Sequence, residues 1–281
     1  MQRNTSARTI VVAGGTDGMG RATALARLER GDTVVVIGRS AEKAAGLAGQ
    51  AERLGAADRF AFIKADLGSI AEVRKVIARI AEAYPVVDAL VLTANRQNMK
   101  RQESPEGLES TFSLYYVARY LLGHGLAPQF DAAPDPVIIN VAGPGTKAGA
   151  VLWDDLHLNG KYNTMRAQLQ AGRANDLLAV AFAEDPSSKA KYVLYHPGFT
   201  QTDAINQFNQ PLRSIVKLYA KVGAKSVTDS AAPMVEWIEN PPATRLTVDD
   251  RGKPVDLGLK MFDKGNAARL AVVTEELLTQ R

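Results

Sequence analysis

Short runs of apolar residues recur along the chain, and longer stretches with a helical spacing of apolar positions separate them. The runs are "TIVVA" (9–13), "TVVVIG" (33–38), "FAFIKA" (60–65), "VDALVLT" (87–93), "PVIINVA" (136–142) and "KYVLYH" (191–196). Helices are expected around residues 19–30, 41–54, 69–84, 106–127 and 166–184. Nearly continuous apolar strands that alternate with helices predict a parallel sheet covered on both faces.

The last third of the chain departs from this alternation. "AINQFNQPLRSIVKLYAKV" (204–222) is amphipathic, and we interpret residues 203–225 as a lid over a substrate pocket. Residues 227–239 read as a helix, and a polar segment "PPATRLTVDDRGKP" and a last helix near 264–280 make up a C-terminal extension, 240–281. Because no low-complexity or linker-like run divides residues 1–281, we expect one domain.

Composition excludes some classes of function. The chain has 281 residues, of which 46% are hydrophobic and 23% charged, which is typical of a globular protein. We expect residues 1–8 to be flexible, and they lack the apolar stretch of a secretion signal. No apolar run is long enough to span a bilayer. The sequence therefore predicts a soluble, cytoplasmic protein without a membrane partner. No cysteine and three scattered histidines argue against a metal site. A dispersed net charge of +4 argues against nucleic acid and is compatible with an anionic small ligand.

The first strand leads into "AGGTDGMGRATA", in which three glycines have the spacing G-x-x-x-G-x-G. Glycines allow a tight turn and close approach of the backbone to a pyrophosphate, and the following helix offers free N–H groups at its N-terminus. The residues predicted to bind a dinucleotide here are Gly14, Thr16, Asp17, Gly18, Met19 and Gly20. With the strand pattern, this predicts an α/β Rossmann-type fold, doubly wound, with about seven mostly parallel strands and helices on both faces.

The residues after the second and third strands bear on the choice of cofactor. In sites that bind NAD(H), an acidic residue after the second strand binds the ribose 2′-hydroxyl. This chain has Arg39 and Ser40 there, which could bind a 2′-phosphate, so the sequence favours NADP(H). Asp66 and Leu67 follow the third strand in position to meet the adenine ring. A helix N-cap is an equally good account of Asp66.

With these residues in place, the chain resembles the short-chain dehydrogenase/reductase family over nearly its whole length. The glycine loop and "KADL" match that family's motifs, and "WDDL…GKY" and "DKGNAARL" are similar to its retinol-dehydrogenase-like and WW-domain-oxidoreductase-like branch. The resemblance implies that Ala94, in "LTAN" (92–95), lies on the cofactor. It also implies that "YHPGFTQTD" lines the nicotinamide side through Pro197, Gly198, Thr200 and Thr202.

The family's catalytic positions are substituted in this chain. Its asparagine aligns with Tyr115 and its serine with Gly143. Its tyrosine and lysine align with Gln168 and Gly172 in "RAQLQAGRAND" (166–176). In the family that tyrosine moves the proton at the substrate oxygen, and a glutamine, which does not titrate, cannot do so.

Other side chains could supply the missing proton. "YNTMR" (162–166) is an alternative alignment of the catalytic motif, with Tyr162 as the tyrosine and Arg166 in place of the lysine. Asp154, Asp155 and His157 lie in an insertion that borders the substrate in the resembling branch, although a solvated loop explains them as well. Our candidate catalytic residues are therefore Tyr162, Asp154 and His157.

Three functions remain open. The first is an NADP(H)-dependent reductase that acts on a small, largely apolar carbonyl or on an activated C=C or C=N bond. The second is a non-redox enzyme of the same fold, such as a cyclase or isomerase, and the third is a non-catalytic binder of a nucleotide or small molecule. We rank them in that order and expect a small-molecule partner; a homodimer is compatible with the sequence.

Overall fold

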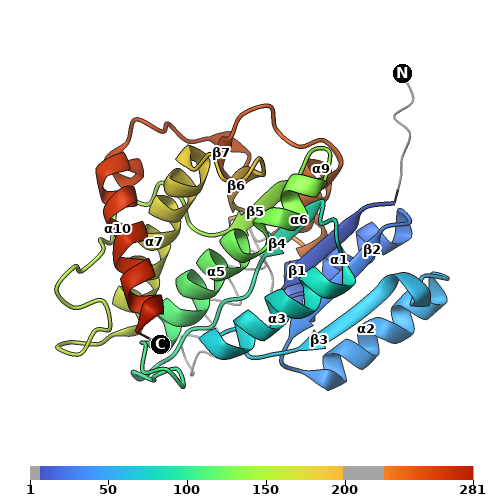
Figure 1. The fold of residues 1–281 in the computed structure, drawn as a ribbon, viewed down its shortest axis with the longest axis horizontal. Coiled ribbons are helices and arrows are strands. Elements are labelled where there is room, and N and C mark those ends of the chain that lie inside the picture. Colours follow the sequence, from blue (N-terminus) through green and yellow to red (C-terminus); the bar gives the residue numbers. More distant parts are fainter. Residues whose placement is uncertain (1–6, 199–224, 281) are drawn as a thin grey trace.

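The computed structural model describes residues 7–198 and 225–280. Its strands form one sheet in the order β3-β2-β1-β4-β5-β6-β7-β8. Figure 1 labels β1 to β7 of this sheet. Among the described strands, β8 alone is antiparallel to its neighbour. The strands are β1 (Thr9–Ala13), β2 (Thr33–Gly38), β3 (Phe60–Lys64), β4 (Ala89–Leu92), β5 (Val137–Val141), β6 (Lys191–His196), β7 (Leu246–Asp250) and β8 (Lys253–Pro254). The predicted Rossmann-type fold is confirmed, with eight strands in the described residues rather than about seven.

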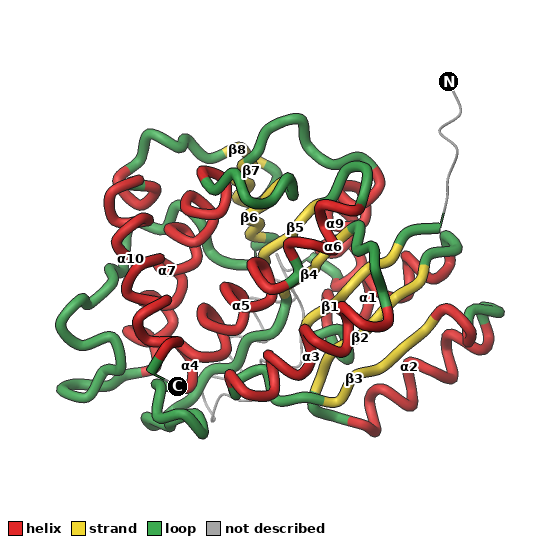
Figure 2. Tube along the Cα trace, in the orientation of Figure 1, coloured by secondary structure: helices red, strands yellow, loops and turns green. Residues whose placement is uncertain are grey.

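Helices lie on both sides of the sheet (Figure 2). They are α1 (Gly18–Glu29), α2 (Ala41–Arg53), α3 (Ile70–Ala83), α4 (Ser110–Phe112), α5 (Ala118–Gly125), α6 (Ala127–Ala132), α7 (Thr164–Glu184), α9 (Val227–Glu239) and α10 (Lys264–Thr279). A π-helical turn, Ser113–Val117, joins α4 to α5, and 3₁₀ turns span Ala57–Arg59 and Lys260–Phe262.

Two hydrophobic cores result from the alternation of side chains along the strands. Val11 and Val35 point to the face covered by α3, α5 and α7, which Figure 1 shows next to one another in front of the sheet. Ile10 and Val34 point to the other face, where they pack with apolar residues of α1, α2 and α9. All four side chains are fully buried. Because successive residues of a strand point to opposite faces, apolar strands of this kind require helices on both.

The segment that we interpreted only as polar, "PPATRLTVDDRGKP", forms β7 and β8. β7 pairs with β6 in parallel from Tyr192↔Leu246 to His196↔Asp250. Val248 is the one fully buried residue of β7, so this strand lacks the apolar run that revealed the others. Its position was therefore missed, because pairing with β6, and not its own composition, holds it in the sheet.

Two predicted helices have different starts in the structure. The helix expected over 106–127 begins at Ser110, since Gly107 has a left-handed φ of 78° and the Glu109 carboxylate accepts hydrogen bonds from the N–H groups of Thr111 and Phe112. Helix α7 begins at Thr164, where Asn163 caps it. The substrate-pocket lid expected at 203–225 lies outside the described residues except for Lys225, and so do Thr200 and Thr202.

The end of the chain covers α5 and α7. Helix α10 packs along α7, as Figure 1 shows, and the Tyr116 hydroxyl lies 2.6 Å from that of Thr274 on α10. The Arg269 guanidinium stands 4.1 Å from the centre of the Trp153 ring. Within the described ranges, no helix has the length and apolarity needed to cross a bilayer.

Candidate functional site

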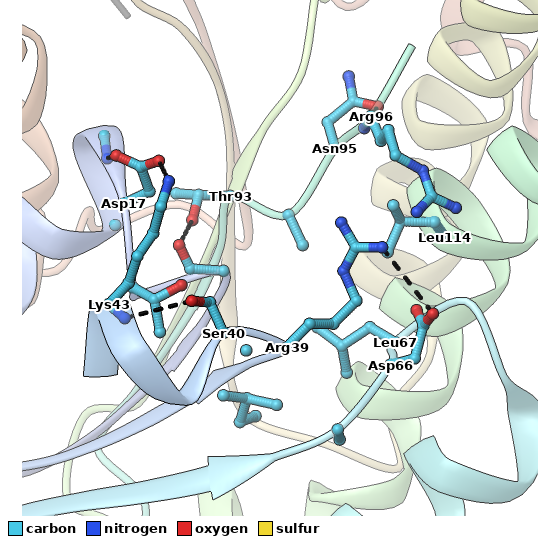
Figure 3. Close-up of a pocket in the computed structure, with 18 of the residues that line it drawn as sticks. Asp17, Arg39, Ser40, Lys43, Asp66, Leu67, Thr93, Asn95, Arg96 and Leu114 are labelled. Atoms are coloured by element: carbon cyan, nitrogen blue, oxygen red, sulfur yellow. Dashed lines mark hydrogen bonds and ion pairs between the residues drawn. The ribbon is translucent and has the colours of Figure 1, made fainter. Parts of the chain in front are cut away.

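A cavity of about 610 Å³ opens above the carboxyl ends of β1, β2 and β4. Its walls include the residues predicted at the nucleotide end, namely Gly14, Thr16, Asp17, Gly18, Met19, Gly20, Arg39, Ser40, Asp66, Leu67 and Ala94. Figure 3 shows several of them around the opening. In doubly wound sheets, ligands bind outside the carboxyl ends of the strands, and the cavity has that position.

Two glycines of the loop after β1 have no room for a side chain. Gly14 has a φ of 88°, and a Cβ there would lie 2.6 Å from the backbone nitrogen of Ala94. A Cβ on Gly20 would lie 2.5 Å from the Gly14 carbonyl oxygen. Helix α1 begins in this loop, so its first N–H groups open onto the cavity, which suits a pyrophosphate.

Two cations stand at the rim of the cavity near β2. Arg39 lies 4.0 Å from the Asp66 carboxylate, and Lys43 forms an ion pair with Asp17 (Figure 3). All four side chains are about half exposed. Burial alone would raise the pKa of Asp17, but the hydrogen bonds from Lys43 and the Gly18 N–H outweigh it and hold that pKa below its ordinary value. The rim can thus present two positive charges to an anionic group.

The structure separates the two accounts of Asp66. Ser69, not Asp66, is the N-cap of α3, because its hydroxyl accepts the hydrogen bond from the Glu72 N–H. The Asp66 carboxylate instead accepts a hydrogen bond of 2.9 Å from the Gly68 N–H, in the turn before the helix. Asp66 therefore shapes the cavity wall, and the N-cap alternative is wrong.

The sequence analysis did not predict several residues that line the cavity. They are Lys43, Thr93, Asn95, Arg96 and Leu114, together with Ile37, Gly38 and Ala65. Lys43 could have been found, because it follows Ser40 by three residues, within the first turn of α2. Asn95 and Arg96 directly follow β4, at the same edge of the sheet as the glycine loop. Leu114 had no comparable signal, since only the packing of the π-helical turn brings it there.

Gln168 lies against the wall of this cavity. The Asn95 side-chain amide donates to the Gln168 Oε1 at 3.0 Å, and the Gln168 Nε2 donates to the Arg96 carbonyl at 3.0 Å. One turn further along α7, a Cβ on Gly172 would have no atom within 4 Å. Gln168 therefore lies next to the cavity wall, and Gly172 leaves open space beside α7.

The other two substituted positions differ in burial. Tyr115 is 7% exposed, and the Arg119 guanidinium lies 4.4 Å from the centre of its ring. Arg119 is itself buried and donates to the carbonyls of Ala94 at 2.9 Å and Val141 at 2.8 Å. A Cβ on Gly143 would meet only the Thr146 hydroxyl, at 3.8 Å. Arg119 thus joins the ends of β4 and β5 below the cavity.

The three candidate catalytic residues are not among those that line the cavity. The Tyr162 hydroxyl donates to the Asn98 carbonyl at 2.7 Å, and Arg166 is exposed and donates to the Lys161 carbonyl. Asp154 is exposed, while Asp155 accepts hydrogen bonds from the N–H groups of Asn159 and Gly160. The His157 ring stands edge-on to Phe112, with 6.4 Å between ring centres. Their catalytic roles stay predictions.

The Pro–Gly segment follows β6, two strands away from β4. Pro197 is buried, and Gly198 has a φ of 86°. A Cβ on Gly198 would approach the Arg251 side chain to 3.0 Å. Neither residue is among those that line the described cavity, so their contact with the nicotinamide stays a prediction.

A buried carboxyl group lies beside this site on α7. Burial raises the pKa of Asp176 to about 7, although the hydrogen bond and charge of Arg173 at 2.8 Å oppose the shift. Arg173 also donates to the carbonyl of Thr146, at 2.8 Å. This pair therefore ties the loop after β5 to α7.

We expect Asp176→Asn to make stability less dependent on pH. The folded-state pKa lies above the unfolded value, so Asp176 contributes stability at low pH that is lost as pH rises through about 7. A shift of one pKa unit corresponds to about 1.4 kcal/mol. The free energy of unfolding of the variant, relative to that of the wild type, should therefore be roughly 2–3 kcal/mol higher at pH 8 than at pH 5. Urea denaturation at both pH values measures this, and the exposed change Asp58→Asn serves as control. An equal difference from the wild type at both pH values would contradict it.

Comparisons with known proteins agree with this geometry. Residues 8–153 match the family described as short chain dehydrogenase. A protein of Streptomyces sp. (strain C5), provisionally named as a daunorubicin C-13 ketoreductase, is 28% identical over 279 residues, which cover 94% of this chain and 90% of that protein. Human retinol dehydrogenase 13 is 27% identical over 202 residues, which cover 70% of this chain and 60% of that relative.

Solved structures share the fold. An uncharacterised protein from Mycobacterium paratuberculosis has a TM-score of 0.74 at 20% identity, with 96% of this chain and 92% of that chain covered. The NADPH-dependent 3-quinuclidinone reductase of Rhodotorula rubra has a TM-score of 0.68 at 18% identity, with 90% and 96% covered. From the family match, the relatives and the sheet order, we conclude that the chain belongs to the short-chain dehydrogenase/reductase family, in its retinol-dehydrogenase-like branch.

Proposed function

We propose that this protein is an NADP(H)-dependent reductase of a small, largely apolar carbonyl compound or of an activated C=C or C=N bond. The observation that carries the proposal is the pair of cations at the cavity rim, Arg39 after β2 and Lys43 in the first turn of α2. A ribose 2′-phosphate between them would meet two positive charges. Names of relatives support this choice, since one is an NADPH-dependent reductase and another is named as a ketoreductase.

The residues present fit a dinucleotide along the length of the cavity. Gly14 and Gly20 leave room for a pyrophosphate against the backbone, and the first turn of α1 supplies N–H donors. Lys43 can turn from Asp17 to a 2′-phosphate at little cost, because an ion pair between half-exposed side chains contributes about 0–1 kcal/mol. When bound, the nicotinamide supplies hydride chemistry.

The amides at the other end of the cavity can position a cofactor or substrate. The side-chain amides of Asn95 and Gln168 are hydrogen-bonded to each other, and each can redirect one of these hydrogen bonds to a ligand. Neither titrates, so neither moves a proton. This favours a second candidate function, a non-redox enzyme or a nucleotide binder on the same fold, in which positioning replaces acid–base catalysis.

The functions are separated by two measurements on the wild-type protein: the affinity for NADPH, and the loss of reduced nicotinamide absorbance with carbonyl compounds. The ketone named in the Streptomyces relative, C-13 of daunorubicin, is the first substrate to test. Binding with turnover supports the reductase. Binding without oxidation indicates a binder, and chemistry that is indifferent to NADPH indicates the non-redox enzyme.

Arg39→Ala is expected to weaken NADPH binding much more than NADH binding. A charge-assisted hydrogen bond contributes roughly 1.5–3 kcal/mol, which corresponds to about a 10- to 100-fold rise in the Kd for NADPH. Titration calorimetry with both cofactors measures the change. Arg53→Ala, at the far end of α2, is a matched control that should leave both affinities unchanged. Equal affinity of the wild type for NADPH and NADH would refute NADP(H) preference.

A further inference from the structure

We propose that the Tyr115 hydroxyl, beside the buried guanidinium of Arg119, is the proton donor of this enzyme and takes over the role for which Gln168 is unsuited. The inference rests on the proposed reductase function. Three observations carry it: Tyr115 lies between the cavity wall and α7, its hydroxyl has no hydrogen-bond partner among the described residues, and the Arg119 charge against its ring has no carboxylate partner among them.

Packing places Tyr115 next to the cavity wall, because Arg119, whose guanidinium lies against its ring, donates to the carbonyl of the lining residue Ala94. Its neighbour Leu114 lines the cavity, and both belong to a π-helical turn, a feature common at functional sites. The Asn175 side chain on α7 donates to the Tyr115 carbonyl at 2.7 Å. Asn175 lies one turn after Gly172, where the missing side chain leaves open space. Tyr115 therefore stands beside the position that lost its lysine.

The hydroxyl of Tyr115 differs from those of the other large buried tyrosines. It makes no hydrogen bond to any residue in the described part of the chain, although buried tyrosine hydroxyls usually find a partner. The others each have one: Tyr116 with Thr274, Tyr192 with Asn140, and Tyr195 with the Ser230 carbonyl. The Tyr115 hydroxyl is thus available to a ligand.

Arg119 supplies a buried positive charge beside Tyr115. Its guanidinium is 4.4 Å from the centre of the Tyr115 ring and donates to neutral acceptors, the Asn140 side chain and the carbonyls of Ala94 and Val141. Within residues 7–198 and 225–280, no carboxylate forms an ion pair with it. A buried cation stabilises a phenolate formed beside it.

The surroundings of Tyr115 keep its hydroxyl protonated. Burial raises the pKa of Tyr115, the Asp176 carboxyl on α7 raises it further, and Arg119 on its own helix lowers it. Since the net effect is a raised pKa, the hydroxyl is protonated at neutral pH and acts as an acid. The hydroxyl thus has the proton that a donor needs.

Hydride transfer and proton transfer together convert the carbonyl to an alcohol. The carbonyl carbon accepts a hydride, with its two electrons, from the reduced nicotinamide, which becomes oxidised. The π electrons of the C=O bond move to oxygen, and that oxygen takes the phenolic proton of Tyr115 and becomes an alcohol. The phenolate, held beside Arg119, regains a proton from water.

Tyr115→Phe tests the inference by activity. It should lower kcat for carbonyl reduction roughly 10²- to 10⁴-fold, the usual contribution of general acid catalysis, with the Kd for NADPH unchanged. Tyr120→Phe is the matched control on α5; its hydroxyl makes only a 3.3 Å contact with Glu275 on α10, and full activity is expected. If Tyr115→Phe retains full activity, or if Tyr162→Phe alone abolishes it, the inference is overturned.

A spectroscopic test works without turnover. With 3-fluorotyrosine at position 115, the ¹⁹F resonance should shift when NADPH and a ketone bind together, whereas the same label at position 120 should not. Because fluorine lowers a phenol's pKa, the alkaline limb of the kcat profile should also move to lower pH. A label at 115 that does not respond to NADPH and ketone refutes the inference, and so does bound NADPH without turnover.

The two proposals fail differently. Absence of NADPH binding by the wild type would defeat the proposed function and with it this inference. Normal NADPH binding and turnover, together with an active Tyr115→Phe variant, would defeat the inference alone.

Discussion

Arg27→Ala should lower the free energy of unfolding by about 3–5 kcal/mol, the usual cost of removing one partner from a buried ion pair. Arg27 of α1 is 1% exposed, and its guanidinium lies 2.5 Å from the Asp32 carboxylate and 2.8 Å from that of Glu239. The contact joins α1 to the end of α9, across one face of the sheet. Without Arg27, the buried Asp32 carboxylate loses its cationic partner and keeps the hydrogen bond from the Arg8 N–H. Urea denaturation at neutral pH measures the loss.

A neighbour on the same helix provides the control. Arg30 lies 3.6 Å from the same Glu239 carboxylate but is 47% exposed, so Arg30→Ala should cost only about 0–1 kcal/mol. The loss of stability at low pH should also change in the Arg27→Ala variant. Burial acts to raise the pKa of Glu239, but hydrogen bonds from Arg27 and Arg8 lower it to about 2, so this stability is lost as pH falls toward 2. Similar losses for the two variants would show that burial of the pair is unimportant.

Gly14→Ala is expected to destabilise the protein by about 3 kcal/mol or more and to weaken NADPH binding. A left-handed φ costs an alanine roughly 1–2 kcal/mol, and overpacking adds roughly 1–3 kcal/mol. The new Cβ would lie 2.6 Å from the Ala94 backbone nitrogen, so the loop or the end of β4 must shift. That shift displaces N–H groups that face the cavity. Urea denaturation and calorimetry with NADPH measure the two effects.

Gly46→Ala is the matched glycine control. Gly46 lies inside α2, and a Cβ there meets nothing within 4 Å. Alanine favours a helix interior over glycine by about 0.5–1 kcal/mol, so this variant should be slightly more stable, with unchanged NADPH affinity. If Gly14→Ala behaved like Gly46→Ala, the loop would not need to approach β4 as closely as it does.

Local signals predicted most of the fold. The apolar runs predicted β1, β2, β5 and β6 to within one residue at each end, since a strand buried on both faces must be apolar throughout. The glycine spacing marked the loop that faces the cavity, because only glycine fits at positions 14 and 20. β7 escaped prediction, since its side chains are mostly half-buried and polar and its pairing with β6 is a long-range contact.

The sequence by itself determined which residues follow each strand. It therefore determined which residues line the cavity at its nucleotide end. Parallel strands bring their carboxyl ends to one edge, so Arg39 and Asp66 meet there whatever the details of packing. Only the tertiary structure decided the partners of the substituted positions. Gln168 pairs with Asn95, and Arg119 lies against Tyr115, through the packing of α5 and α7 on the sheet. The residues in these contacts are far apart in the chain, and no motif or periodicity links them. Their contacts therefore depend on three-dimensional packing.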